Sequence, residues 1–91
     1  MDIEQMIRET AVRYEIDGQM FLETAKCESS LHPAAIGDGG ESVGLFQIHL
    51  PSHPEVTAIL ALNPIESIEW SAKKFKADPT IWTCYKKLYE R

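Results

Sequence analysis

The sequence has no long apolar run, no signal-peptide pattern at its first residues and little basic charge. No apolar stretch approaches the roughly 20 residues needed to cross a bilayer, and Met1–Glu4 lacks the basic and apolar regions of a signal peptide. Nine basic against fourteen acidic residues leave a net charge of −5, which argues against nucleic-acid binding and against docking on anionic membranes by charge. If the protein acts outside the cell, its export signal was removed, belongs to a longer parent chain, or is replaced by a route such as phage delivery.

Cysteine is scarce, with Cys27 and Cys84 the only two. Two thiols are too few for a disulfide scaffold or a four-cysteine zinc site. They allow one bridge that closes a loop of about 58 residues, which the chain-entropy model values at roughly 4 kcal/mol as an upper limit. The alternative is a pair of buried free thiols, and the sequence leaves both possibilities open.

What is present indicates one mainly helical domain spanning residues 1–91. The composition, 44% hydrophobic and 25% charged, is that of a folded globular chain rather than a disordered one. Apolar residues recur at helical spacing in five segments, and we expect an all-α fold of about five helices with a small glycine-rich loop or β-hairpin insert. The segments predicted as helical are approximately residues 3–14, 18–30, 55–62, 64–75 and 79–89.

The ends of these segments carry local capping signals. Asp17 is placed to cap the second helix, and His32-Pro33 should end it. Asn63-Pro64 and Asp78-Pro79 each combine a capping residue with proline at the first helical position. In the second helix the predicted inward positions are Met20, Phe21, Thr24, Ala25 and Cys27, and in the fourth they are Ile65, Ile68, Ala72 and Phe75.

Residues 36–50 do not follow a helical pattern. Four glycines in residues 36–44 permit tight turns and close approach to the backbone. The following run, residues 45–48, is either a brief strand or the first turn of a buried helix. Long irregular segments in small domains are often functional, so we expect the active loop here.

Glu28 interrupts the apolar face of the second predicted helix. At 100° per residue it lies close to Phe21 and Ala25, with Thr24 at the margin. Burial disfavours a charged carboxylate and raises its pKa, which suits a general acid that protonates a poor leaving group. The competing interpretation is a glutamate at a helix end that turns outward into solvent.

The order of motifs resembles that of soluble lytic transglycosylases and goose-type lysozymes. Glu28-Ser29-Ser30 ends a helix, a glycine-rich spacer follows, and then comes Gly44-Leu45-Phe46-Gln47-Ile48, with Phe46 where methionine is usual. Residues 63–68 resemble the opening of a family helix, and residues 82–85 resemble its aromatic final helix. The likeness covers approximately residues 20–90.

This resemblance implies a lysozyme-like fold and cleavage of the β-1,4 bond between N-acetylmuramic acid and N-acetylglucosamine. Glu28 would protonate the bridging oxygen and then act as base toward the acceptor. That acceptor is the muramic acid's own 6-hydroxyl in transglycosylases and water in hydrolases. A protein nucleophile is not required in transglycosylases, because the substrate's acetamido oxygen can stabilise the reacting carbon, as in other substrate-assisted enzymes.

A second carboxylate is available for positioning water. Asp38 lies in a Gly-Asp-Gly-Gly context that resembles the goose-type loop, and Glu41 is its rival. Either could instead be an ordinary solvated turn residue, and we favour Asp38. The goose-type pattern has an acid where this chain has His49, which weakens the case for the full goose-type mechanism.

The remaining expected site residues follow from the same resemblance and from their chemistry. The residues assigned to substrate binding are Ser29, Gly44, Leu45, Phe46, Gln47, Ile48, His49 and Tyr85. Gln47 offers an amide donor and acceptor to sugar groups, and Tyr85 is expected to face Glu28 from the last helix. His49 and His53 lack a third correctly spaced ligand, so we expect neither a metal nor any other cofactor.

The expected partner is the glycan strand of peptidoglycan, bound by a monomer in the cell envelope, in the periplasm or outside the cell. Two alternatives compete with this hypothesis. One is an inactive cell-wall-binding or phage-tail module of the same fold, and the other is an unrelated helical interaction domain. The sequence does not choose between hydrolysis and formation of an anhydro product.

Overall fold

The computed structural model describes residues 2–90. Within that range the α-helices are α1 (Ile3–Tyr14), α2 (Gly18–Ser29), α3 (Ala58–Leu62), α4 (Pro64–Ala77) and α5 (Thr83–Tyr89). The strands are β1 (Ile36–Gly37), β2 (Ser42–Val43) and β3 (Ile48–His49), and short 3-10 helices are η1 (Asp38–Gly40), η2 (Leu50–Ser52) and η3 (Pro79–Ile81). The predicted class, mainly helical with a small β insert, is confirmed.

Two of the predicted helix starts are confirmed in detail. The carboxylate of Asp17 accepts a hydrogen bond from the Met20 N–H at 2.9 Å, so Asp17 caps α2. Asn63 accepts from the Glu66 N–H at 3.1 Å, and Pro64 is the first residue of α4. In each case a side-chain oxygen satisfies a main-chain donor that the first helical turn leaves free.

Other helix boundaries differ from the prediction. Asp78 caps the 3-10 helix η3 rather than the last helix, and α5 begins only at Thr83. The third helix is shorter than expected because Thr57, through its hydroxyl, caps a helix that starts at Ala58. The second helix ends at Ser29, since Ser30 already has a left-handed backbone with φ of 54°.

A helical core cluster joins α1, α2 and α4. Phe21 of α2 stacks on Phe46 with ring centroids 4.6 Å apart and meets Phe75 of α4 edge-on at 5.1 Å. The predicted inward position Ile65 was wrong, because its side chain is 65% exposed. Cys27 also lies on the exposed side of α2, whereas Leu22, which was not predicted, is completely buried.

The strands form a three-stranded antiparallel sheet in the order β1-β2-β3. Ile36 pairs with Val43, and Val43 pairs in turn with Ile48. A second cluster of apolar residues, containing Val43, Ile48, Val56 and Ala61, packs beneath this sheet and α3. Residues 45–47 form a turn, and only Ile48 of the run 45–48 belongs to a strand, so neither the strand nor the helical turn expected for this run describes it as a whole.

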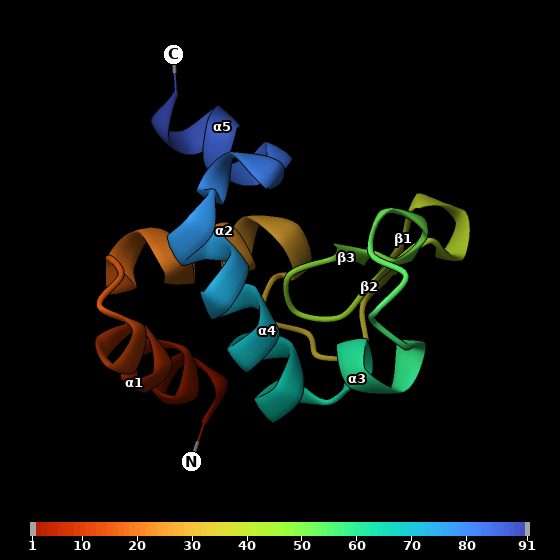
Figure 1. Cartoon of the computed structure of the whole chain (residues 1–91), viewed down its shortest axis with the longest axis horizontal. Helices are drawn as coiled ribbons and strands as arrows, with labels where there is room; N and C mark the ends of the chain where they lie inside the picture. The colour runs from red at the N-terminus through yellow and green to blue at the C-terminus, as the bar shows by residue number, and fades with distance from the viewer. Residues whose placement is uncertain (1, 91) are drawn as a thin grey trace.

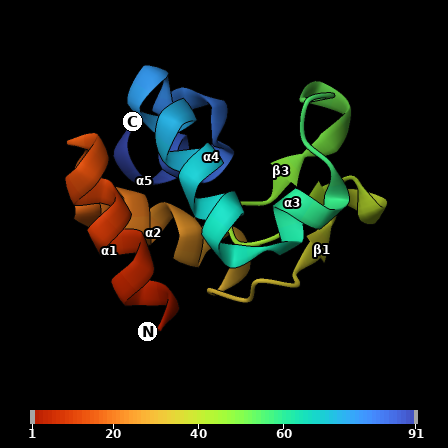
Figure 2. The same cartoon turned by 60° about the horizontal axis from the view of Figure 1, so that its bottom comes forward.

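The sheet and α3 lie on one side of the molecule, and α1, α2, α4 and α5 lie on the other, in both views (Figures 1 and 2). α4 is the helix of this side that contacts α3, and its Trp70 packs against both hydrophobic clusters. No helix within residues 2–90 has the length and hydropathy needed to cross a membrane.

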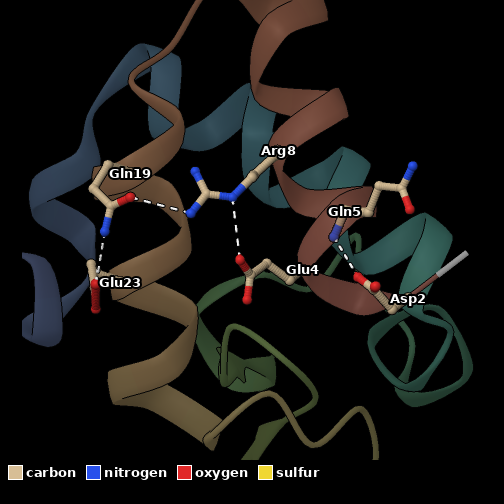
Figure 3. Close-up of polar contacts among 6 residues, drawn as sticks. All are labelled: Asp2, Glu4, Gln5, Arg8, Gln19 and Glu23. Atoms are coloured by element: carbon tan, nitrogen blue, oxygen red, sulfur yellow. Dashed lines mark hydrogen bonds and ion pairs between the residues drawn. The ribbon is translucent and has the colours of Figure 1, made fainter.

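Exposed polar side chains link α1 to α2 on the outside of the helical body (Figure 3). Arg8 donates to Glu4 at 3.4 Å and to Gln19 at 3.3 Å, and Gln19 donates to Glu23 at 2.8 Å. Asp2 caps α1 beside this chain of contacts. Contacts between exposed side chains add little stability, so the buried apolar faces account for most of the α1–α2 packing.

Candidate active site

A cleft of about 590 Å³ lies between the sheet and the helical body. Its walls come from the end of α2, the strands, η1, η2, the middle of α4 and the η3–α5 junction. The residues that line it are Glu28, Gly37, Asp38, Ser42, Gln47, Ile48, His49, Ser52, His53, Trp70, Ile81, Trp82 and Thr83.

Glu28 lies on the last turn of α2 with its half-buried carboxyl in this cleft. Burial raises the pKa of Glu28, and the negative charge of Asp38 adds to the rise. A hydrogen bond from the Cys84 N–H, at 3.4 Å from Glu28 Oε2, and the charge of Lys87 oppose it. The net upward shift favours the protonated carboxyl, which is the form able to donate a proton to a bound substrate.

Cys27 and Cys84 form a disulfide in the structure, with their Cα atoms 5.9 Å apart. The bridge connects the end of α2 to the first turn of α5, and its α2 member, Cys27, directly precedes Glu28 in the sequence. Of the two arrangements that the sequence left open, the structure has the bridge rather than free thiols.

The structure separates the two candidate second carboxylates. Asp38 lines the cleft and accepts a hydrogen bond from the hydroxyl of Ser42. Glu41 does not line it, and its carboxylate lies 3.4 Å from Nε2 of His49. Asp38 is therefore the one of the pair that shares the cleft with Glu28.

Gln47 points its side chain into the cleft from the turn between β2 and β3. Its amide nitrogen donates to the main-chain oxygens of Ala35 at 3.1 Å and Gly44 at 3.0 Å. Both amide hydrogens are thereby used, so the carbonyl Oε1 is the group that remains for a ligand. A Cβ on Gly37 would overlap this oxygen, and glycine at that position therefore leaves room for it.

Three residues assigned to substrate binding lie outside the cleft. Leu45 and Phe46 have no exposed surface because they belong to the helical core cluster. Ser29 is buried and donates from its hydroxyl to the main-chain oxygen of Leu45 at 2.7 Å. The indole N–H of Trp82 likewise donates to the main-chain oxygen of Phe46 at 2.9 Å. Leu45, Phe46 and Ser29 therefore hold the turn against the helices rather than face a ligand, whereas Trp82 both anchors the turn and lines the cleft.

Gly44 and Tyr85 also lie away from the cleft lining. Gly44 is buried with φ of 88°, and a Cβ there would overlap the main-chain oxygen of Ala61, so glycine allows β2 to approach α3. Tyr85 packs edge-on against Phe75 and beside Tyr89, with centroids 5.4 and 5.3 Å apart. The expectation that Tyr85 faces Glu28 therefore needs correction, because α5 contributes its first turn to the cleft instead.

Ile48 and His49 do line the cleft, from β3. Ile48 is 2% exposed and therefore offers little surface to a ligand. The Nδ1 atom of His49 lies 2.7 Å from the hydroxyl of Ser52, which orients the ring. Among residues 2–90, no group of three or more His, Cys, Asp or Glu side chains is arranged to hold a metal ion.

A profile of the family described as Transglycosylase SLT domain matches residues 5–78. The chain belongs to this family. The match contains Glu28, Asp38 and Gln47 and ends just before η3. Comparisons with curated proteins and with solved structures gave no significant match. The resemblance inferred from the sequence motifs is confirmed, and it places the chain among peptidoglycan lytic transglycosylase domains.

One wall of the cleft of this transglycosylase domain is formed by residues that the sequence motifs do not include. Trp70 lies off the apolar stripe of α4, and its ring meets that of His53 edge-on with centroids 4.9 Å apart. A large aromatic residue outside the buried stripe of its helix is unusual, and this feature of the sequence could have identified Trp70 as a site residue. Ile81 and Thr83 gave no comparable signal, because their position depends on how η3 packs against α2 and the sheet.

Proposed function

We propose that this chain cleaves the β-1,4 bond between N-acetylmuramic acid and N-acetylglucosamine in peptidoglycan, with Glu28 as general acid and then base. Membership of the transglycosylase family supports the reaction class. The observation that carries the proposal is the half-buried carboxyl of Glu28, whose pKa is raised, in the cleft between sheet and helices. A protonated carboxyl in a substrate-sized cleft is the arrangement that glycosidic cleavage requires.

In the first step the Glu28 carboxyl donates its proton to the bridging oxygen on C4 of N-acetylglucosamine. The bond between this oxygen and C1 of the muramic acid breaks, and the departing sugar leaves as an alcohol. Positive charge develops at C1, where the substrate's own acetamido oxygen can stabilise it. This route needs no protein nucleophile, as in other substrate-assisted glycosidases.

In the second step the Glu28 carboxylate removes the proton of the muramic acid 6-hydroxyl. The 6-oxygen bonds to C1, which yields the 1,6-anhydro sugar and returns Glu28 to its protonated form. No water is consumed, so each anhydro product is lighter by one water than the corresponding product of hydrolysis. The cleft supplies orientation for this intramolecular attack, which is where such sites gain much of their rate.

Hydrolysis of the same bond is the second candidate reaction, and the position of Asp38 supports it. The Asp38 carboxylate lines the same cleft as Glu28 and is held by the hydroxyl of Ser42. A carboxylate so placed would orient a water molecule toward C1. In that case the products carry a free reducing end, and Asp38→Asn lowers their yield more than it lowers the yield of anhydro sugars.

Substrate contacts within this proposal fall on the side chains that face the cleft. The carbonyl of Gln47 accepts from a sugar N–H or hydroxyl, and His49 contacts the glycan from β3. The partner is the peptidoglycan strand, bound by one copy of the chain acting in the cell envelope. No cofactor takes part in either step.

The test is digestion of purified peptidoglycan by wild type, Glu28→Gln and Glu41→Gln, with mass spectrometry of the soluble muropeptides. Glu41 is the matched control, since this exposed carboxylate lies outside the cleft lining. We expect anhydro products from wild type and Glu41→Gln and none from Glu28→Gln. Reducing-end products would establish hydrolysis instead. If no protein releases fragments while all of them pellet with the wall, the chain is a binding module.

A further inference from the structure

The disulfide lies directly beside the proposed catalytic acid. Cys27 precedes Glu28 on the last turn of α2, and Cys84 is the second residue of α5. Cys84 also contacts Glu28 directly, because its main-chain N–H lies 3.4 Å from Glu28 Oε2. Cys84 is thus bonded covalently to Cys27, which precedes Glu28 in the chain, and its N–H donates a hydrogen bond to the Glu28 carboxyl.

Besides the bridge, α5 is held mainly by its half-buried Tyr85, whose ring packs edge-on against Phe75 of α4. α5 has seven residues, and a helix this short is not stable in isolation. It packs mainly against α2 and η3, and Lys86, Lys87 and Leu88 on it are exposed. Cys84 is the buried residue of α5, so the bridge is the strongest tie between α5 and the end of α2.

We propose that Cys84, held by its disulfide to Cys27, is a positioning residue for the Glu28 carboxyl, so that glycan cleavage requires the oxidised bridge. The inference rests on the proposed function of Glu28. Reduction by a dithiol transfers two electrons and two protons to the bridge, which gives two cysteine thiols while the dithiol becomes a disulfide. The domain is then inactive in a thiol-reducing compartment and becomes active in an oxidising one.

The bridge also affects the ionisation of Glu28. Burial raises the pKa of Glu28 most and the charge of Asp38 on η1 adds to the rise, whereas the Cys84 N–H and the charge of Lys87, both on α5, lower it. Release of α5 removes the two lowering contributions and also uncovers part of the carboxyl, so it changes the set of contacts that determines the pKa of Glu28. A merely stabilising bridge would change the folded fraction without changing this balance.

The experiment compares the oxidised protein, the same protein reduced by dithiothreitol, and two forms in which the reduced thiols are joined by alkyl linkers. In the linked forms each thiolate displaces one halide, from diiodomethane for a one-carbon linker or from 1,4-dibromobutane for a four-carbon linker. Both linkers keep the loop closed, which preserves most of the effect of the bridge on the unfolded chain. Only the four-carbon linker relaxes the spacing between α2 and α5.

Each form is assayed for kcat, KM and the pH dependence of kcat/KM on soluble peptidoglycan strands, with the folded fraction measured by circular dichroism. We expect kcat per folded molecule to fall about 10- to 100-fold in the reduced and four-carbon forms, as loss of precise placement produces elsewhere. KM should change less than about twofold, the alkaline limb of kcat/KM should shift along the pH axis, and reoxidation should restore the reduced form. The one-carbon form should remain close to the oxidised protein.

Equal kcat and an unmoved alkaline limb in the four-carbon form would overturn the proposal, whether or not the reduced protein stays folded. Loss of activity that only follows the folded fraction would overturn it as well. Inactivity of the oxidised wild type would instead refute the proposed function. In that case the pKa of the Glu28 carboxyl is measured by NMR in the oxidised and four-carbon forms. We expect the two pKa values to differ. Equal values would show that Cys84 does not position the carboxyl.

Discussion

Gly40 and Gly44 form a matched pair for testing how tightly the turn of the active site packs. Both have a left-handed backbone, with φ of 99° and 88°, so alanine at either position costs about 1–3 kcal/mol in backbone strain. A Cβ at Gly44 would also overlap the main-chain oxygen of Ala61, whereas a Cβ at Gly40 would meet nothing within 4 Å. Relief of that overlap requires a main-chain shift, which costs about another 1–3 kcal/mol.

Gly44→Ala should therefore lower the free energy of unfolding by about 2–6 kcal/mol, and Gly40→Ala by about 1–3 kcal/mol. Urea unfolding followed by circular dichroism measures both values under the same conditions. The folded Gly44→Ala protein should also lose activity, because the Gly44 main-chain oxygen accepts from the Gln47 amide. Equal stability of the two variants would refute the conclusion that Gly44 is needed for close packing of β2 against α3.

Three further predictions concern the surroundings of the site and the low-pH stability of the fold. Ser29→Ala should cost about 1–3 kcal/mol in urea unfolding, because it leaves a buried main-chain oxygen of the turn without its donor. Asp38→Asn removes a negative charge that raises the pKa of Glu28, so the alkaline limb of kcat/KM should move to lower pH. A hydrogen bond from Arg13 lowers the pKa of Glu69. The contact therefore stabilises the fold at pH values above the unfolded-state pKa of Glu69, and this stabilisation is lost as pH falls through the folded-state pKa. Glu69→Gln removes the titrating group. The melting temperature of this variant should therefore depend less on pH on the acid side than that of the wild type.

The features that sequence reasoning predicted well are determined by short stretches of chain. Asp17 and the Asn63-Pro64 pair mark helix starts because capping depends on a side chain and a main-chain donor three residues away. The placement of Glu28 within the second helix follows from helical periodicity in the same way. Such signals do not depend on how the helices pack together.

The features that could not be predicted depend on tertiary packing. Leu45 and Phe46 belong to a motif associated with the sugar groove, yet their side chains enter the helical core because the turn at Gly44 directs them away from the cleft. Ile65 fits the apolar stripe of α4 but lies where no other element covers it. Trp70 reaches the cleft because α4 passes between the two hydrophobic clusters, and one helix alone does not specify this arrangement.

The central claim is that Glu28 donates the proton, and comparison of two titrations tests it most directly. The first is the pKa of the Glu28 carboxyl, measured by carbon-13 NMR with assignment from Glu28→Gln. The second is the alkaline limb of kcat/KM for peptidoglycan cleavage, which reports the essential acid of the free enzyme. We predict that both fall at the same pH, above the ordinary range of a glutamate, and that Asp38→Asn moves both downward together. A Glu28 pKa in the ordinary range, or an alkaline limb that does not move with it, would contradict the account.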